Sequence, residues 1–251
     1  MVGLDKREGQ ILALLQDGEE HSVARLSELL GVSAVTIRAD LKSLELKGMV
    51  IRSRGTAIPA FHPQLMEKQG RNTAEKEAIA RLAATFVSDG DSIMISNGTT
   101  CALIARYLFG KRDIQIVTNS TLVLPYVRVN GNISLTLVGG EFRPQAEALV
   151  GPSAVKQIED YHVSTAFFGT DGLTLEYGLT TALVENADIL RRMCSQAGRR
   201  ILTVDSSKLG NKGFVRILPL TDVDILITDS GMPEETIRDI REMGVDVRIA
   251  R

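Results

Sequence analysis

The sequence has no tryptophan, two cysteines, three histidines and only 4% aromatic residues over 251 positions. Two cysteines are too few for a disulfide scaffold, and the histidines do not stand at metal-ligand spacing, so we expect no structural metal. No apolar run is long enough to span a bilayer, and the first residues lack the apolar core of a secretory signal. These absences predict a cytoplasmic protein without a membrane partner.

An excess of positive charge is also missing. The chain carries 29 Lys and Arg against 31 Asp and Glu, a formal net charge of −2. A DNA-binding hypothesis therefore needs a local basic patch, because the whole-chain charge does not support it. What is present is 44% hydrophobic and 24% charged residues with 22 glycines, the composition of a folded globular protein. The length allows one small and one medium domain.

Three helical patterns open the chain. Apolar residues recur at helical spacing over residues 11–15 and again over residues 23–30. Gly31 then supplies a tight turn, and Ser33 is placed to cap a third helix that runs through Leu44. A short helix, a glycine turn and a capped longer helix form the helix-turn-helix arrangement, whose second helix lies in the DNA major groove.

The third helix predicts a DNA-facing surface. Ile37, Leu41 and Leu44 form its apolar stripe, so the residues on or beside the opposite face are free to touch DNA. Residues 49–51 and 56–58 are expected to be two strands of a basic hairpin, the wing, which binds phosphates while the helix reads bases. The predicted DNA-binding residues are Ser33, Val35, Thr36, Arg38, Ala39, Lys42, Arg52 and Arg54.

The required local basic patch is present between residues 34 and 54. Five positive residues there outnumber two negative ones, and the positive ones are Arg38, Lys42, Lys47, Arg52 and Arg54. The alternative interpretation is an ordinary three-helix subdomain whose Arg and Lys side chains form a solvated face.

A second domain follows a linker. Residues 59–72 mix proline, glycine and polar residues without periodicity, and they predict a linker between domains of residues 1–58 and 73–251. After an amphipathic helix over residues 73–86, strands and helices alternate, which predicts a mainly parallel α/β sheet covered by helices. The expected strands are residues 92–96, 114–118, 134–138, 165–169, 200–204, 224–228 and 245–249, and the expected helices are 99–108, 183–197 and 233–243.

Ligands of such sheets bind outside the carboxyl ends of the strands. After the first strand, residues 97–100 join a glycine to hydroxyls at a helix N-terminus, a combination that can hold a phosphate. Carboxylates and amides after other strands suit sugar hydroxyls, and Lys208 and Arg143 add positive charge. Any one of these motifs can also be a simple turn or helix cap. The predicted effector-binding residues are Asn97, Gly98, Thr99, Thr100, Thr118, Asn119, Ser120, Gly140, Arg143, Asp171, Asp205 and Lys208.

Signals of catalysis are weak. Cys101 stands at a predicted helix start and is a candidate nucleophile or redox sensor, but we interpret it as an inert packed thiol. His162 has no recognisable acid-base partner and is interpreted as structural or surface-exposed. We find no catalytic triad and predict no cofactor.

One run of residues carries a resemblance to a known family. Together with residues 44–48, it resembles the signature of the DeoR family of repressors: Val32-Ser33-Ala34-Val35-Thr36-Ile37-Arg38-Ala39-Asp40-Leu41. Ala39 replaces a second arginine that is common in the family, residues 54–57 replace the usual paired glycines of the wing, and Asn97 stands where the family often has an acidic or small residue. The order of the strand-end motifs also resembles the family's sensor domain, so the resemblance covers nearly the whole chain.

The resemblance implies both a fold and a function. The fold is an N-terminal winged helix-turn-helix followed by a larger, Rossmann-like α/β sensor domain, which is related to ribose-phosphate isomerase and glucosamine-phosphate deaminase. In this family the sensor binds a phosphorylated sugar, which usually weakens operator binding and relieves repression of carbohydrate catabolism genes.

Two other functions remain open on the residues alone. The chain can be an isomerase-like or deaminase-like enzyme with an added helix-turn-helix, although the available bases Asp171, Glu185 and Asp205 lie in no motif of those enzymes. It can also be a dimerisation platform that senses nothing. We favour a non-enzymatic regulator whose partners are double-stranded operator DNA, a phosphorylated sugar and further copies of itself, because operator symmetry usually matches protein symmetry.

Overall fold

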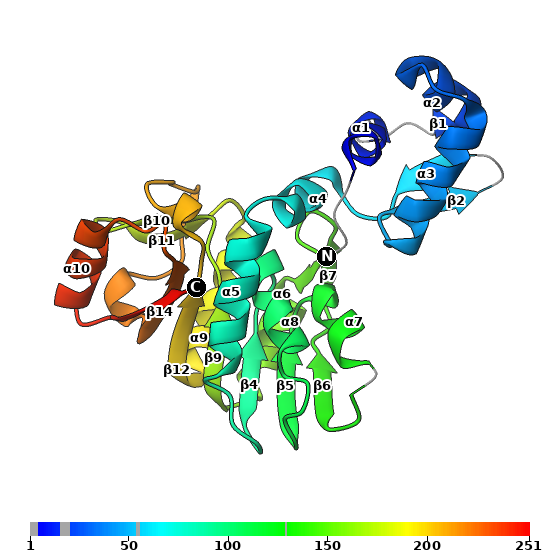
Figure 1. Ribbon diagram of the computed structural model, residues 1–251. Coiled ribbons are helices and arrows are strands. Elements are labelled where there is room, and N and C mark those ends of the chain that lie inside the picture. The colour runs from blue at the N-terminus through cyan, green and yellow to red at the C-terminus, as the bar shows by residue number, and fades with distance from the viewer. Residues whose placement is uncertain (1–4, 16–20, 54–55, 129) are drawn as a thin grey trace. The chain divides into compact units, whose positions relative to one another are not determined.

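The structure is a computed structural model that describes residues 5–15, 21–53, 56–128 and 130–251. The chain divides into two compact units, Met1–Lys68 and Gln69–Arg251 (Figure 1). We call them the N-terminal unit and the C-terminal unit and describe each by itself. The predicted wing residue Arg54 falls in one of the gaps between the described ranges.

The N-terminal unit is the predicted winged helix-turn-helix. Its strands pair antiparallel in the order β1-β3-β2, with Val50 opposite Pro59 and His21 opposite Ala57. The first of these strands was not expected, because residues 17–21 are a polar break in the sequence. The elements are α1 (Lys6–Leu14), β1 (His21–Ser22), α2 (Val23–Leu30), α3 (Ala34–Leu46), β2 (Val50–Ser53) and β3 (Thr56–Pro59).

Local capping explains where the second and third helices begin and end. The Ser22 side chain accepts a hydrogen bond from the backbone N–H of Arg25 and caps α2. Gly31 ends α2 in the left-handed conformation, with φ of 64°. The side chain of Ser33 then caps α3 by accepting from Thr36 N–H. The turn between α2 and α3 is therefore built by the residues that the sequence predicted for it.

The segment predicted as a linker contains a helix, α4 (Pro63–Gly70). Leu65 on this helix is buried, and Met66 packs against the hydrophobic core of the N-terminal unit. Because α4 has only eight residues, it is too short to show a clear apolar period in the sequence. The sequence pattern predicted a linker over residues 59–72 and did not predict this helix.

The C-terminal unit is built on a seven-stranded sheet with the order β15-β14-β12-β9-β4-β5-β6. All neighbouring strands in it are parallel, which confirms the predicted α/β fold class. The strands are β4 (Ser92–Ile95), β5 (Ile114–Thr118), β6 (Ile133–Leu137), β9 (Val163–Phe168), β12 (Ala197–Thr203), β14 (Ile225–Asp229) and β15 (Asp246–Ala250).

Helices cover both faces of this sheet. Helices α5 and α6 pack together in front of the strands in Figure 1, and α8 and α9 pack together on the other face. In that second layer, Ile158 of α8 and Ile189 of α9 share a core with Met94 and Val117 of the sheet. The helices are α5 (Thr73–Ala84), α6 (Thr99–Arg106), α7 (Leu124–Val127), α8 (Pro152–Glu159), α9 (Val184–Ser195) and α10 (Glu234–Glu242), with short 3₁₀ turns η2 (Thr121–Val123), η3 (Ser206–Lys208) and η4 (Leu220–Asp222).

Two small antiparallel sheets complete the C-terminal unit, and neither was predicted. They are a hairpin of β7 (Glu141–Arg143) and β8 (Ala148–Val150), and a sheet of β10 (Gly172–Thr174), β11 (Gly178–Thr181) and β13 (Val215–Arg216). Strands of two to four residues are too short to show a period of two in the sequence.

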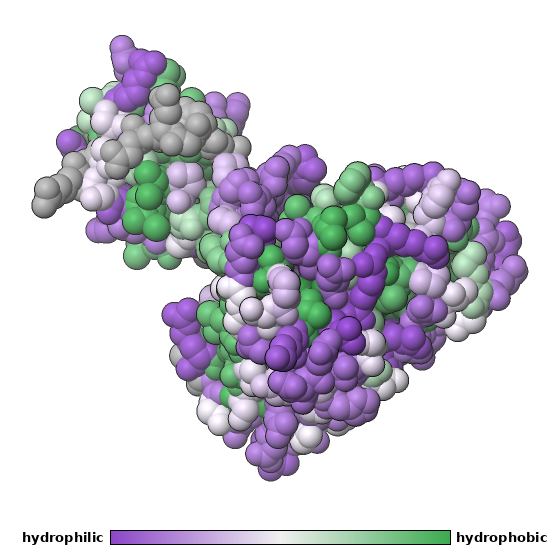
Figure 2. Space-filling model, turned by 180° about the vertical axis from the view of Figure 1, so that it is seen from behind, coloured by the Kyte–Doolittle hydropathy of each residue, from purple (hydrophilic) through white to green (hydrophobic). Residues whose placement is uncertain are grey.

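The surface of the molecule is mostly hydrophilic when it is seen from behind. Smaller hydrophobic areas lie between the hydrophilic ones (Figure 2). None of the helices in the described ranges has the length and apolarity that crossing a bilayer requires.

Candidate DNA-binding and effector-binding sites

The solvent side of α3 carries most of the predicted DNA-binding residues. Val35 is 73% exposed, and Arg38, Ala39 and Lys42 are also exposed. Ser33 differs from them, because its hydroxyl caps the helix and lies 2.9 Å from the Thr36 hydroxyl. Four of the predicted residues, Val35, Arg38, Ala39 and Lys42, are therefore exposed on α3.

The basic patch is smaller than the sequence suggested. The Lys47 Nζ donates to both carboxylate oxygens of Glu8, at 2.7 and 2.6 Å, and this lysine side chain is only 14% exposed. Arg52 forms an ion pair with Glu45 at 3.4 Å. Counting Lys47 in the DNA-facing charge was wrong, since its charge is used inside the unit. Arg38 and Lys42 form no ion pair with any residue that the structure describes.

One of the two negative residues on this helix, Asp40, is also neutralised internally. Asp40 is buried and accepts two hydrogen bonds from the Arg7 guanidinium, at 2.6 Å from Nε and 2.9 Å from Nη2. This bidentate pair joins α1 to α3 and removes a carboxylate that would repel DNA phosphates.

A second acidic anchor holds the same two helices. Glu8 is 2% exposed, and burial by itself opposes its ionisation. Hydrogen bonds from Lys47, from the Ser43 hydroxyl at 2.6 Å and from Asp5 N–H at 2.9 Å outweigh this effect and hold the Glu8 pKa below its usual value. Two buried carboxylates therefore fix the orientation of α3 against α1. One belongs to α1 and the other to α3.

At the carboxyl edge of the main sheet, the ends of β4 and β5 are tied together. The backbone N–H of Asn97 donates to Asn119 Oδ1 at 3.0 Å, and Asn119 Nδ2 donates to Asn97 Oδ1 at 3.3 Å. Thr118 Oγ1 donates to the Ile95 carbonyl at 2.6 Å. Because Thr118 and Asn119 are fully buried and engaged in these bonds, their geometry favours holding the 97–100 loop in place over direct contact with a ligand.

The next residue, Ser120, is different. It is fully buried, yet its hydroxyl has no hydrogen-bond partner among the described residues. Buried hydroxyls are normally paired, so an orphan at this sheet edge marks a place where an additional polar group fits.

The loop after β4 has the features of an anion site. Gly98 precedes α6 with φ of 133°, and no described side chain caps the helix, so its first N–H groups are available to a negative ligand. Thr99 and Thr100 occupy this first turn. Cys101 lies beneath it, 3.3 Å from the Thr203 hydroxyl, and burial raises the pKa of its thiol, in agreement with the interpretation as a packed thiol.

Asp205, at the end of β12, forms a second polar cluster. It is 2% exposed, and its Oδ1 accepts from Asn72 Nδ2 at 2.8 Å and from Ser207 N–H at 3.2 Å. Burial works against ionisation, but the hydrogen bonds from Ser207 and Asn72 and the nearby charges of Lys208 and Lys76 lower the pKa of Asp205. The carboxylate is therefore ionised at neutral pH and ready to accept hydroxyl donors.

Sequence reasoning missed Lys76 in this cluster. It is 5% exposed, and its Nζ donates to the Arg71 carbonyl at 2.6 Å. A signal for it existed, because Lys76 precedes Ile79, Ala80 and Ala83 at the spacing of the buried stripe of α5. A lysine on a buried stripe is unusual and indicates a polar site beneath the helix.

The remaining predicted effector residues contact other groups. Arg143 forms ion pairs with Glu141 at 2.6 Å and with Glu185 at 2.7 Å. Asp171 accepts from the Thr181 hydroxyl at 2.8 Å. Gly140 has φ of 155°, and a Cβ there would lie 2.5 Å from the Val150 carbonyl oxygen, so glycine is required sterically. Within the described residues, no hydrogen bond joins Arg143 or Gly140 directly to the Asn97 or Asp205 clusters.

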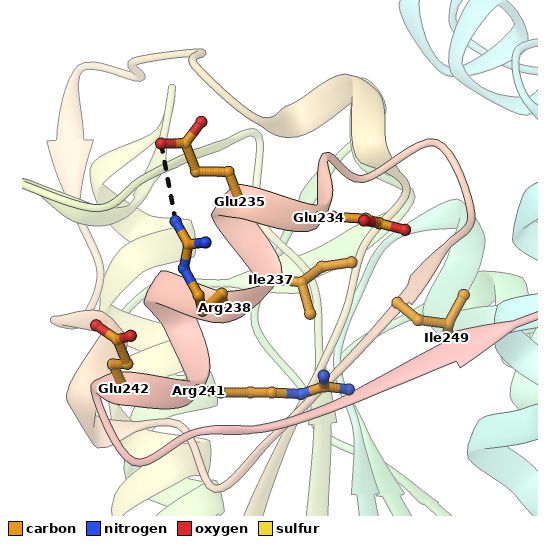
Figure 3. Close-up of a pocket in the computed structure, with 7 residues that line it drawn as sticks. All are labelled: Glu234, Glu235, Ile237, Arg238, Arg241, Glu242 and Ile249. Carbon is orange, nitrogen blue, oxygen red and sulfur yellow. Dashed lines mark ion pairs between the residues drawn. The ribbon is translucent and has the colours of Figure 1, made fainter.

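A separate pocket lies along α10 and β15 (Figure 3). Three glutamates and two arginines line it, and Arg238 pairs with Glu235 at 3.9 Å. None of the predicted effector-binding residues is among them. The mixed charge and the distance in sequence from the strand-end residues give no reason to place an anionic effector there.

Comparison with known proteins is consistent across the chain. A model of the DeoR C terminal sensor domain matches residues 71–230, and a model of the DeoR-like helix-turn-helix domain matches residues 7–60. The chain is 34% identical to the HTH-type transcriptional regulator GlpR of Haloferax volcanii, over 96% of each chain. It is 32% identical to the HTH-type transcriptional repressor GlcR of Bacillus subtilis, over 97% of this chain and 96% of that one.

Among solved structures, ribose 5-phosphate isomerase A of Methanocaldococcus jannaschii is 20% identical with a TM-score of 0.40, over 55% of each chain. The two family models together span most of the chain, and they match the helix-turn-helix and the parallel sheet at the places where the structure has them. The chain therefore belongs to the DeoR family of transcriptional regulators.

Proposed function

We propose that this regulator is a repressor of carbohydrate catabolism genes whose binding to double-stranded operator DNA is controlled by a phosphorylated sugar. Residues 1–58 bind DNA, residues 73–251 sense the sugar, and residues 59–72 connect them. The observation that carries the proposal is the pairing of a capped, outward-facing helix α3 with a polar strand-end site in the same chain. The sign of the regulation is supported by the similarity to GlcR, which is a transcriptional repressor.

On the DNA side, Arg38 and Lys42 supply the exposed positive charge of α3. Val35 and Ala39 offer apolar contacts, of the kind that thymine methyl groups accept. Arg52 on β2 belongs to the wing and is placed for phosphate contacts, although it first has to exchange its pairing with Glu45.

On the effector side, the two polar clusters divide the work. The uncapped first turn of α6, with Thr99 and Thr100, suits the phosphate. Asp205 suits sugar hydroxyls, since an ionised carboxylate is a strong acceptor, and Lys208 adds positive charge next to it. Ser120 offers a buried hydroxyl that has no described partner to give up. For the other predicted effector-binding residues, a contact with the sugar phosphate also remains a prediction.

The regulator is proposed to act in the cytoplasm as a homo-oligomer, so that paired α3 helices meet successive operator half-sites. The sugar can change operator affinity only if it binds two arrangements of the protein with different affinity. Control of DNA binding therefore requires a physical connection between the strand-end site and residues 59–72.

The test is fluorescence-anisotropy binding of the full chain to DNA from upstream of its own gene neighbourhood, at fixed salt. Ribose 5-phosphate, fructose 6-phosphate and glucosamine 6-phosphate are added in turn. Specific binding that one of them alters is the expected result. Absence of specific DNA binding under every condition contradicts the proposal. Product formed from these sugars, detected by mass spectrometry, would indicate the enzyme alternative, and a melting temperature that none of them shifts would indicate a platform that senses nothing.

A further inference from the structure

Asn72 stands at the helix-capping position before α5, but its side chain bonds to another part of the sensor domain. It is the residue before α5, where an asparagine side chain normally caps the helix by accepting from its first N–H groups. Here the side chain forms no such cap, and its Nδ2 instead donates to Asp205 Oδ1 at 2.8 Å, across 133 positions of sequence. The residue that starts the sensor fold is thus bonded to a predicted effector-binding carboxylate.

The backbone of Asn72 is held in an unfavourable region. Its φ is 51°, in the left-handed region that residues with a Cβ enter at a cost, asparagine more easily than most. Since the side chain forgoes the helix cap, the contact with Asp205 is what holds this conformation. A conformation that depends on one tertiary hydrogen bond relaxes when that bond is lost.

The preceding peptide is tied to the same place. Lys76, one turn into α5, donates to the Arg71 carbonyl at 2.6 Å, and its charge also acts on Asp205. Residues 71 and 72 directly follow α4, which ends at Gly70. One bond, from Asn72, therefore joins the end of the connecting segment to Asp205, and the Lys76 bond ties the preceding peptide to α5.

Resting on the function proposed above, we propose that Asn72 is the positioning residue through which an occupied effector site acts on the connecting segment. Asp205 Oδ1 already accepts from Asn72, from Ser207 N–H and from the Ser207 hydroxyl, which is as much as one carboxylate oxygen holds. Asp205 Oδ2 accepts no hydrogen bond from the described residues, so a sugar hydroxyl donates to this oxygen and turns the carboxylate toward the sugar. The Asn72 bond is then given up, because residue 72 gains by leaving the left-handed region, and the chain leaves the sensor in a new direction.

The test compares full-length Asn72→Gly with the unchanged chain. Glycine adopts a φ of 51° without strain but has no donor for Asp205. Operator affinity is measured by anisotropy with and without ribose 5-phosphate, fructose 6-phosphate and glucosamine 6-phosphate, and binding of each sugar is measured separately by its shift of the melting temperature. Couplings of this kind change affinity by roughly 5- to 150-fold. We expect Asn72→Gly to bind both operator and sugar. The ratio of its operator affinities without and with the sugar should fall toward one.

Asn72→Asp gives an independent readout without any sugar. A carboxylate at residue 72 repels Asp205 and opens the contact, so operator affinity without sugar should shift toward the value that the unchanged chain shows with its effective sugar phosphate. The matched control is Asn132→Gly, the same substitution in an exposed turn before β6, at the opposite end of the parallel strands. It should leave the ratio unchanged.

The outcomes separate the two proposals. If Asn72→Gly binds the sugar and keeps the ratio of the unchanged chain, or if Asn72→Asp leaves sugar-free affinity unaltered, the role of Asn72 is overturned while the sugar-controlled regulator stands. If none of the three sugars binds the unchanged chain or alters its operator affinity, the proposed function is overturned and the role of Asn72 with it. A merely structural Asn72 would lower the melting temperature and leave the ratio intact.

Discussion

The two units present their functional residues in opposite ways. On α3, most of the side chains predicted to meet DNA point outward, and Val35 is 73% exposed. At the strand ends, Asn119 and Asp205 are buried and already hydrogen-bonded, Asp205 through its Oδ1 oxygen. A surface that binds a large partner such as DNA can be exposed. A small ligand is instead recognised by a preformed, concave set of groups.

Both units nevertheless rely on buried ion clusters to aim those residues. Glu8 and Lys47 fix α1 against α3, and Asp205, which lies near the charge of Lys76, holds the start of α5 at the end of β12 through its bond from Asn72. The difference is in what the cluster touches. The first lies behind the recognition surface, while the second lies within the predicted site, so only the second can respond to the ligand directly.

The largest effect is expected from Glu8→Ala. The substitution leaves the Lys47 ammonium buried without its carboxylate, which should lower the stability of the N-terminal unit by about 3–5 kcal/mol. Hydrogen exchange of amides in residues 21–53 measures this loss, and those in residues 130–251 should not change. Glu28→Ala is the control, because Glu28 is 73% exposed in its pair with Arg25, and such pairs contribute less than about 1 kcal/mol.

The same carboxylate predicts a pH dependence with a definite sign. The Glu8 pKa is lower in the folded protein than its ordinary value of 4.5, so its contribution to stability is complete above that value and is lost as the pH falls through the lowered pKa. Glu8→Gln should remove this part of the acid sensitivity of the N-terminal unit. An unchanged acid profile would contradict the role given to Glu8.

The next largest effect tests the steric demands of the C-terminal unit. In Gly140→Ala, the new Cβ meets the Val150 carbonyl oxygen at 2.5 Å in a left-handed backbone, and we expect a loss of about 3 kcal/mol. Gly31→Ala in the N-terminal unit meets nothing within 4 Å and bears only the cost of its φ of 64°, about 1 kcal/mol. Denaturant unfolding measures these losses of stability, and Gly131→Ala is the control because Gly131 has no close neighbour and no positive φ. Equal losses at Gly140 and Gly31 would contradict the steric role given to Gly140.

A smaller effect is expected from Arg38→Ala, and it is confined to DNA binding. Losing an exposed base or phosphate contact should weaken operator binding by about 1–3 kcal/mol and leave sugar binding unaltered. Lys42→Ala should weaken binding to all DNA sequences alike. The slope of the logarithm of affinity against the logarithm of salt concentration should become shallower by about 1. Arg248→Ala, on the exposed side of β15, controls for loss of positive charge, and an effect equal to that of Arg38→Ala would remove Arg38 from the contact set.

The smallest effect should come from Arg143→Ala. Its two ion pairs are exposed to solvent screening, so the stability of the C-terminal unit should change little. Glu141 and Glu185 already hold the guanidinium, and a phosphate must replace them, so the Kd for the sugar phosphate should rise by less than about tenfold. A calorimetric titration of the variant measures this change, and a complete loss of binding would make Arg143 the principal phosphate ligand.

The sequence was most informative where contacts are local. Ser22, Gly31 and Ser33 act on residues at most five positions away, and their residue types alone predicted the turn and both helix starts. The strands of the main sheet were also predicted, because they are mostly apolar runs bounded by turn residues, a signal that even the four residues of β4 carry. In the effector site, the loop of Asn97 and Gly98 could be predicted for the same reason, since its motif is continuous.

Tertiary structure decided how charged groups are used. Lys47 looks like part of the basic patch in sequence, and its partner Glu8 is 39 positions away. Lys76 looks like an ordinary helix residue, and Asn72 like an ordinary linker residue, until packing places both beside Asp205. Backbone conformation and capping depend on near neighbours and leave a trace in the sequence. The partners of a buried charge depend on which elements pack together, and neither periodicity nor residue type encodes that choice.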